Sequence, residues 1–410
     1  MPLAATVLHL GSQHSISADR FYTVTVEVRT VRSLLRFLPP TVHIKVGGVE
    51  LRSVLHRRRA CHNVAIPAVG RELIAGITVS ASVAVQTIRI LRIDQKDSLG
   101  ALMILSPHPD DAELAAGGLY MDRCRDVSIV TLSSGDRIDN ISSQYVRGLD
   151  KNLVDASARK ATIRSWNSVH TPSLVGVPVS RCVNLGLPDS YLMQIATGKV
   201  PPVAASRHKA ICRSFNAVSM PGDDAKVPTH GATVGDLCHL IELWRPATLI
   251  LMDPEIDVHR DHRASSLLVA DALERCSHRP ETVLLCSVHH RNRLLSHPGR
   301  AFDAGYTASE ADRNDRFFAE VENYVHVLSD ESIKRKALLL ESMCELTHRR
   351  MRAANFFLSI IRLDFRFLWN SVGGDRHIYY NRFLRRTEFF RSVKTKHFID
   401  AVRCHRSKFQ

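Results

Sequence analysis

Hydrophobic and polar residues alternate at every second position over several stretches of the first hundred residues. The alternation is clear over residues 22–29, 42–46 and 77–85. Period-two alternation is typical of β-strands that are buried on one face. We therefore predict a small all-β domain, resembling a β-sandwich, over residues 1–95. This domain carries no recognisable chemistry, and both a packing or dimer-surface role and a glycan-binding role are open.

The pattern changes after residue 100, where continuous apolar runs alternate with helical segments. Such runs are expected in strands that are buried on both faces of a parallel sheet. Strands are expected at 101–105, 127–132, 183–187, 247–252 and 282–288, and helices at 111–125, 157–169, 233–244 and 264–276. Thr233 and Asp236 have the spacing of a capping box that opens the third of these helices. The pattern predicts an α/β fold with a mostly parallel, Rossmann-like sheet and flanking helices.

These changes in pattern divide the chain into three predicted parts: the β domain over 1–95, an α/β core over 100–300, and a C-terminal extension over 301–410. Residues 194–232 are rich in Pro, Gly and Ser and are expected to form a loop over the site. Residues 292–328 are similarly irregular. Within the extension, a long helix that completes the core is expected to begin at Ser329, whereas the tail from Phe356 gives no assignable pattern.

Charge and composition narrow the classes of function. The 55 Lys and Arg residues outnumber the 41 Asp and Glu residues, for a net charge of +14. This excess favours anionic partners, such as phosphorylated or lipid-linked sugars or a membrane surface, although a solubilising surface alone would also explain it. No nucleic acid is expected, because the basic residues are not interleaved with aromatic ones. No apolar run reaches the ~18 residues of a membrane span.

The chain has nine cysteines, an odd number, and none of them forms a Cys-x-x-Cys pair. This argues against a disulfide framework and against a structural zinc ribbon. Reduced thiols in a cytoplasm fit best. The first residues lack the basic start and the cleavage site of a signal peptide, so none is expected there.

The first segment with candidate chemistry is His108-Pro109-Asp110-Asp111, between an expected buried strand and an expected helix. Open α/β sheets bind ligands at this edge. A turn that leads into a helix could aim His108 and Asp111 at one point, and imidazole plus carboxylate is a normal zinc ligand pair. Asp110 would remain available to take a proton from water. The same residues would also be explained by a turn followed by a helix N-cap, with no metal-binding or catalytic role.

The second segment, residues 257–264, follows another apolar strand and should therefore reach the same edge of the sheet. Its His259 and His262, at the start of a helix, could supply one metal ligand and one proton donor. Three protein ligands with an open fourth position are typical of a catalytic zinc. A solvated helix face would explain this pair alone, but the two segments together favour a metal site. His289 could lie at the rim of the site, in the core or on the surface.

Together the two segments resemble the PIG-L/LmbE family of zinc-dependent N-acetylglucosaminyl deacetylases, over roughly residues 100–300. The family motif His-Pro-Asp-Asp matches residues 108–111, and the motif His-x-Asp-His matches residues 259–262. The resemblance implies three zinc ligands: His108, Asp111 and His262. It implies that Asp110 is the base, and that a protonated His259 stabilises the oxyanion and helps to protonate the leaving amine.

Other positions resemble the family more loosely. Asp189 matches an aspartate that contacts the sugar, and Arg159 matches the arginine of a substrate-contacting Arg-x-x-Glu whose Glu is replaced here by Thr162. Asp261 is expected to support the metal ligands without binding the metal. Some family members have a tyrosine at the position of Asp257, so the oxyanion role of that tyrosine is absent here.

The predicted reaction is metal-assisted removal of the acetyl group from an N-acetylated sugar or sugar conjugate. Zn²⁺ is the expected metal, and Fe²⁺ or Co²⁺ would also suit a His-Asp-His site. An amidase acting on another acylated small molecule and a non-catalytic glycan-binding protein are the alternatives. Asp110 and His259 favour catalysis, because a binding protein needs neither. The carrier of the sugar, peripheral membrane contact and the oligomeric state are open.

Overall fold

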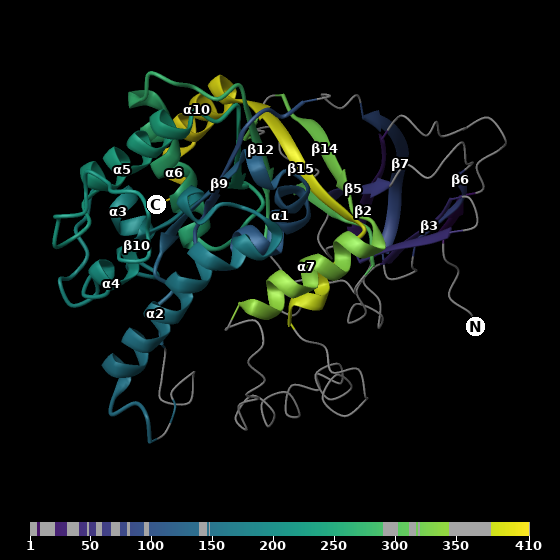
Figure 1. Cartoon of the computed structure of the whole chain (residues 1–410). Helices are drawn as coiled ribbons and strands as arrows, with labels where there is room; N and C mark the ends of the chain where they lie inside the picture. The colour runs from purple at the N-terminus through teal and green to yellow at the C-terminus, as the bar shows by residue number, and fades with distance from the viewer. Residues whose placement is uncertain are drawn as a thin grey trace.

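The computed structural model describes residues 98–138, 146, 148–289, 302–310, 317–318, 320–343 and 379–409, and in the N-terminal part the strands alone. Its centre is a seven-stranded sheet in the order β10-β9-β8-β11-β12-β15-β14 (Figure 1). The first five strands are mutually parallel, and β15 and β14 are antiparallel to their neighbours. The predicted α/β fold with a mostly parallel sheet is confirmed.

The strands of this sheet are β8 (Leu102–Ser106), β9 (Val127–Ser133), β10 (Cys182–Leu187), β11 (Thr248–Met252), β12 (Thr282–Cys286), β14 (Glu322–Val327) and β15 (Thr387–Lys394). The helices are α1 (Asp111–Asp122), α2 (Leu153–His170), α3 (Leu192–Ala196), α4 (Lys209–Arg213), α5 (His230–Trp244), α6 (Arg260–Arg275), α7 (Asp330–Ser342) and α10 (Thr395–Cys404). Short 3₁₀ turns are η2 (Cys124–Asp126), η3 (Thr171–Val175), η4 (Val179–Arg181), η5 (Tyr379–Phe383) and η6 (Arg406–Phe409). No helix of the described residues is long and apolar enough to cross a membrane.

Two hydrophobic cores lie on the two faces of the large sheet. Met103 and Leu105 of β8 pack into the core that also holds residues of α3, α5, α6 and α10. Leu102 and Ile104 pack into the core beneath α1 and α7. All five residues of β8 are buried, which explains why its sequence is a continuous apolar run with no alternation.

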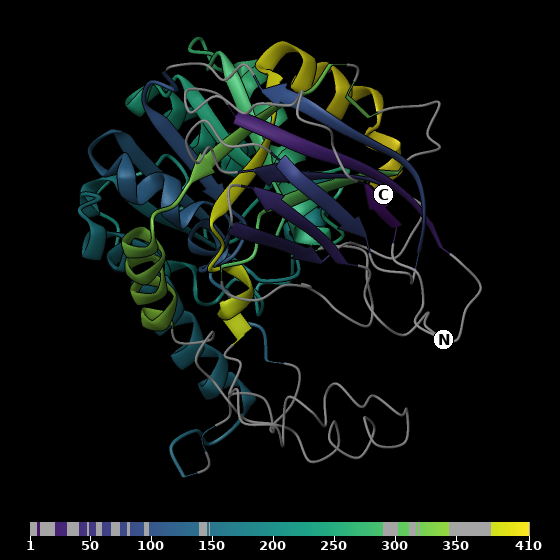
Figure 2. The same cartoon turned by 90° about the vertical axis from the view of Figure 1, so that its right-hand side faces the viewer.

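The N-terminal strands form two four-stranded sheets, in the orders β1-β6-β3-β4 and β13-β5-β2-β7. Their bounds are β1 (Thr6–Leu8), β2 (Phe21–Thr30), β3 (Thr41–Val46), β4 (Val49–Val54), β5 (Ala60–Ile66), β6 (Ile74–Val79), β7 (Val83–Ile93) and β13 (Tyr306–Glu310). Figure 2 shows these strands beside the part of the large sheet that holds β14 and β15. Ala65 packs there against Val325 and Phe389. The division into the domains 1–95, 100–300 and 301–410 stays a prediction.

Several sequence-based expectations differ from the structure. The alternation over 77–85 spans the end of β6 and the start of β7, which are two separate strands. The stretch 292–328 contains β13 and β14, and the tail contains β15 and α10. Helix α5 begins at His230, where the Thr229 side chain accepts a hydrogen bond from the Ala232 N–H. The predicted capping box at Thr233 therefore lies inside the helix.

A buried ion pair from the C-terminal part holds α1 in place. Lys336 Nζ lies 2.7 Å from Glu388 Oε1 and also donates a hydrogen bond to the Leu114 carbonyl. Glu388 accepts hydrogen bonds of 2.7 Å from the backbone N–H groups of Gly118 and Leu119. A Cβ atom on Gly118 would lie 2.5 Å from the Leu328 side chain, which explains why glycine stands there. Helix α1 starts directly after the first candidate segment, so this support also bears on the site.

Candidate metal centre

The first candidate segment forms a closed turn between β8 and α1. Ser106 Oγ donates a hydrogen bond to the His108 carbonyl and accepts one from the Ala112 N–H. Asp111 Oδ2 accepts a 2.9 Å hydrogen bond from the His108 N–H and lies 3.2 Å from His108 Nδ1. The turn therefore brings the imidazole and the carboxylate together, as the spacing predicted.

The second candidate segment reaches the same place because β11 pairs with β8 in parallel. His259 is the residue before α6, and its Nδ1 accepts a hydrogen bond of 3.3 Å from the Asp261 N–H. His262 lies in the first turn of α6 and is completely buried. Its Nε2 is 3.1 Å from Asp111 Oδ2 and 3.2 Å from His108 Nδ1.

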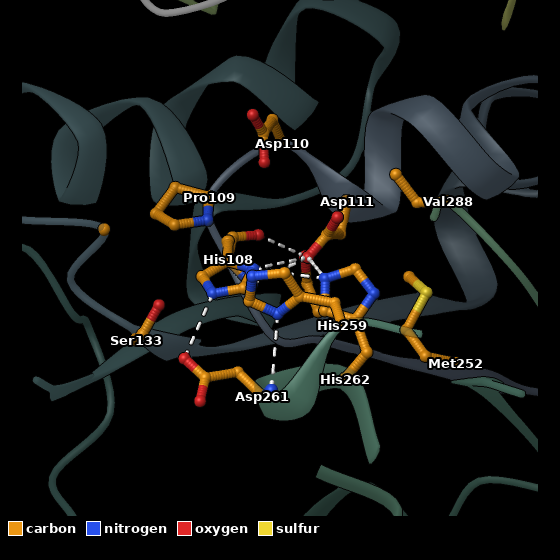
Figure 3. Close-up of polar contacts among 12 residues, drawn as sticks. His108, Pro109, Asp110, Asp111, Ser133, Met252, His259, Asp261, His262 and Val288 are labelled. Carbon is orange, nitrogen blue, oxygen red and sulfur yellow. Dashed lines mark hydrogen bonds and ion pairs between the residues drawn. The ribbon is translucent and has the colours of Figure 1, made fainter. Parts of the chain in front are cut away.

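Three potential ligand atoms therefore converge, one from each of the residues predicted to bind the metal (Figure 3). Their separations of 3.1 to 3.2 Å are close to the about 3.4 Å between ligands of a tetrahedral metal ion with bonds of about 2.1 Å. His262 Nδ1 faces Asp257 at 2.9 Å, and His108 Nε2 faces Asp261 at 3.4 Å. Each carboxylate favours a proton on the ring nitrogen that it faces, which leaves a lone pair on the other nitrogen. The donor set thus fits a divalent cation.

The pKa values of these groups indicate that the site stabilises a positive charge. Burial alone would lower the pKa of His262, but Asp111 and Asp257 raise it to about 10. Burial would raise the pKa of Asp111, but His262 and His108 hold it well below its usual range. In the metal-free protein a proton on the histidines neutralises the buried carboxylates, and a bound cation would take over that role.

The role of Asp257 in the site was not recognised from the sequence. Besides His262, its carboxylate faces the backbone N–H groups of Val288 and His289, each at 3.0 Å, and the N–H of His259 at 2.9 Å. It is fully buried. A carboxylate that orients a metal-ligating histidine through its second nitrogen is a common arrangement at metal sites. The acidic residue five positions before His262 was the available signal.

Asp189 and Asp261 both lie at the outer nitrogen of His108. Asp189 Oδ1 is 3.5 Å from His108 Nε2, and Asp261 Oδ2 also accepts a hydrogen bond from the Ser190 N–H. Burial would raise the pKa of Asp189, but His108 and Arg164 contribute to a pKa far below the usual range. The structure therefore brings both predicted aspartates to the site, and Asp261 lies where a residue supporting His108 was expected.

Asp110 lies beside the centre and not among the converging ligand atoms. Figure 3 shows its side chain apart from them, with no dashed line to any of them. Asp110 Oδ2 is 3.1 Å from Arg164 Nη2, which also donates a hydrogen bond to the Pro109 carbonyl. Arg159, the predicted substrate contact on the same helix, forms a bidentate ion pair with Asp150 instead. The two arginines are five residues apart on α2 and therefore point to different sides of it.

His259 completes the cluster of histidines. Its ring centroid is 4.8 Å from those of His108 and His262 and 5.2 Å from that of His289. Burial and the neighbouring histidines lower the pKa of His259 to about 4. The lowered pKa favours a neutral imidazole in the protein without a bound metal, and the protonated His259 expected from the sequence stays a prediction. Because its Nδ1 accepts the Asp261 N–H, the remaining proton is on Nε2.

An open cavity of about 560 Å³ begins at Asp189 and extends between the start of α2 and the segment after β10. Its lining includes Arg137, Ser157, Gln194 and Arg207 together with the partly exposed Leu153 and Val154. Pockets of about 300–1,000 Å³ are typical of small-molecule sites. Arg159 does not line this cavity.

Gly135 provides a test of how Arg164 is positioned. Gly135 has φ +62°, and a Cβ atom on it would lie 2.6 Å from Arg164 Nη1. We expect Gly135→Ala to destabilise the protein by about 1–2 kcal/mol through its left-handed backbone and, in addition, to push Arg164 away from Asp110. Gly198→Ala is the matched control, because Gly198 has φ +80° and nothing within 4 Å. Urea unfolding of both variants measures the difference, and equal losses would contradict this role of Gly135.

The fold and the site define an α/β protein with a His-Asp-His centre at the carboxyl edge of a parallel sheet. Residues 103–273 match the family model of PIG-L, described as GlcNAc-PI de-N-acetylase. The matched segment contains both candidate segments and lies within the α/β part of the chain. No curated protein sequence matches the chain.

Solved structures show distant similarity. The conserved protein TT1542 from Thermus thermophilus is 16% identical, with 70% of this chain and 92% of that chain covered and a TM-score of 0.34. GalB, the 4-carboxy-2-hydroxymuconate hydratase from Pseudomonas putida, is 12% identical, with 72% and 96% covered and a TM-score of 0.36. The zinc-inhibited form of teicoplanin deacetylase Orf2 is 16% identical, with 72% and 98% covered and a TM-score of 0.34.

Proposed function

We propose that the protein is a metal-dependent hydrolase that removes the acetyl group from an N-acetylated sugar or sugar conjugate. The observation that carries the proposal is the convergence of three ligand atoms at 3.1 to 3.2 Å, next to an open polar cavity. The match of both motifs to a family of de-N-acetylases supports the same reaction.

The proposed metal ligands are His108, Asp111 and His262, with Asp257 and Asp261 orienting the two histidines. Zn²⁺ is the proposed metal, and the same donors would accept Fe²⁺ or Co²⁺. A metal held there supplies Lewis acidity and lowers the pKa of water to about 7.

Asp110 is the proposed general base. A turn of its side chain away from Arg164 would bring the carboxylate toward water at the centre, and such hydrogen bonds often form only with substrate present. Asp110 would accept a proton from the attacking water and later pass it to the leaving amine.

His259 is the proposed donor to the carbonyl oxygen of the acetyl group. Its Nδ1 is occupied by the Asp261 N–H, so Nε2–H is the group available to the substrate. A neutral imidazole fixed in this way donates a hydrogen bond to the oxygen on which negative charge develops.

Replacing His259 by Gln is expected to lower the rate of acetate release by about 10²–10³-fold, because one donor to the oxyanion is lost. Metal content should not change, since His259 is not a proposed ligand. His289→Gln is the control, because His289 lies in the same cluster and has no proposed catalytic role. Equal rates for His259→Gln and the unchanged protein would rule out this role.

The cavity at Asp189 is the proposed sugar site. Asp189 would accept hydrogen bonds from sugar hydroxyls, and Arg137 and Arg207 would favour an anionic carrier. Leu153 and Val154 are 39% and 45% exposed at the same cavity, which favours a substrate with an apolar part, such as a lipid-linked sugar or another acylated small molecule. The substrate contact predicted for Arg159 has no support from its position.

Metal analysis combined with acetate release tests the proposed function directly. The substrate panel consists of N-acetylated sugars, nucleotide sugars, lipid-linked sugars and acylated amines without a sugar. Release from the sugars alone supports the de-N-acetylase, and release from the acylated amines alone identifies an amidase. Sugar binding without release would identify a non-catalytic glycan-binding protein. Reduced thiols favour a cytoplasmic location, which we propose together with peripheral membrane contact.

A further inference from the structure

Two cysteines lie side by side at a place that the proposed reaction does not use. Cys238 is on α5, and Cys276 is the residue that follows α6. The two helices are neighbours (Figure 1). Their Sγ atoms are 2.9 Å apart. We infer that Cys238 and Cys276 are an oxidation site, at which a thiol oxidant of the disulfide class, such as glutathione disulfide, closes a bond between α5 and α6.

The surroundings of the pair hold the two thiols together. Glu242, one turn after Cys238 on α5, accepts hydrogen bonds from the Ser277 and His278 N–H groups and from the Ser277 hydroxyl. The His278 ring contacts the Pro246 carbonyl at 2.7 Å. The end of α6 is therefore fixed against the end of α5 independently of the sulfur atoms. Bond formation requires only a small approach of the two sulfurs.

A metal ion explains this cluster less well than a disulfide does. Glu242 is the acidic side chain that lies with the two thiols in a possible ligand group, but its Oε1 already accepts three hydrogen bonds. Two thiolates on a tetrahedral zinc lie about 3.8 Å apart, since each Zn–S bond is about 2.3 Å. The observed 2.9 Å is well below that spacing.

The reaction proceeds by two thiol–disulfide exchanges. Cys238 is partly exposed and Cys276 is buried, so the Cys238 thiolate attacks glutathione disulfide first and releases one reduced glutathione. Cys276 then attacks the Cys238 sulfur of the mixed disulfide and releases a second one. The two cysteines are oxidised by two electrons, and their two protons end on the two glutathione molecules. Burial raises the pKa of the Cys276 thiol, which agrees with its place as the second to react.

The bond would act on stability and not on the candidate centre. Helix α6 has 16 residues and therefore separates its two ends by about 24 Å. His259 and His262 stand at one end and Cys276 at the other. The bond would close a loop of the chain between two helices that already pack together, which restricts the unfolded state more than the folded one.

The test treats the full chain with glutathione disulfide and maps its peptides without reduction. We expect a cross-link between the peptides of Cys238 and Cys276, and a melting temperature higher by about 5 °C that dithiothreitol reverses. Cys238→Ser and Cys276→Ala should show neither change. Cys404→Ser is the control, because Cys404 is exposed, and it should behave like the unchanged protein.

Two results would overturn the inference. One is glutathione on Cys404 with Cys238 and Cys276 still unlinked. The other is zinc that leaves the protein in Cys238→Ser and that protects both thiols from the oxidant, which would make the pair a metal site.

Discussion

Replacing Asp110 by Asn is expected to lower the turnover number by about 10²–10⁴-fold, the usual loss on removal of a general base. The amide cannot accept the proton from water, but its shape and its contact with Arg164 are largely kept. Asp110 is not one of the three converging ligands, so the metal content should stay at that of the unchanged protein. Acetate release and metal analysis on the same preparation measure both quantities.

Asp189→Asn is the control for this prediction. Asp189 is proposed to contact the sugar, but its carboxylate also lies beside a proposed metal ligand, where a general base could act. Asp189 Oδ1 is 3.5 Å from His108 Nε2, whereas Asp110 Oδ2 is 3.1 Å from Arg164 Nη2. We expect Asp189→Asn to raise KM with a smaller effect on kcat, since its proposed contact is with the sugar. The opposite result, a large loss of kcat in Asp189→Asn and little loss in Asp110→Asn, would move the base to Asp189.

Replacing His262 by Ala is expected to remove the metal and to reduce acetate release to background. The ring is fully buried and is one of the three proposed protein ligands. Its loss also leaves Asp257 without its cationic partner, and breaking a buried charged pair costs about 3–5 kcal/mol. Metal content after dialysis and urea unfolding measure the two effects.

Asp257→Asn is expected to weaken metal binding less than His262→Ala does, and it therefore serves as the comparison for that prediction. The amide keeps the shape of the side chain but no longer fixes the proton on His262 Nδ1 as a carboxylate does. Changes of this kind weaken metal binding by about 10–100-fold. The proposed ligand set would fail if His262→Ala still bound one equivalent of metal.

The parallel part of the fold and the candidate centre could be predicted because their signals are local. Strands β8 and β11 are largely apolar runs, and each of the two candidate segments follows one of them. The carboxyl ends of parallel strands meet at one edge of the sheet. The parallel pairing of β11 with β8 brings His108 and His262 together. Their proximity can therefore be predicted from these two strands and the segments that follow them.

The supporting contacts could not be predicted, because they join residues that are distant in sequence. Arg164 is 54 residues after Asp110 and meets it only through the packing of α2. Arg391 of β15 lies 2.8 Å from Asp253, in the loop that leads to Asp257. Asp236 pairs with Arg213 and accepts the Gly222 N–H, so it was not available to cap α5. No periodicity indicates such partners.

The pairing of β12 with β15 has a consequence for the synthesis of the chain. Thr282–Cys286 pairs in parallel with β11 on one side, and on the other side it pairs with Thr387–Lys394, about a hundred residues later. While the ribosome adds those residues, β12 is an apolar strand with one unpaired edge, which is a site of aggregation. Until the same residues are added, Glu388 cannot bind the backbone of α1 and Arg391 cannot pair with Asp253. We therefore expect chains that stop before residue 387 to aggregate, although both candidate segments are already present in them.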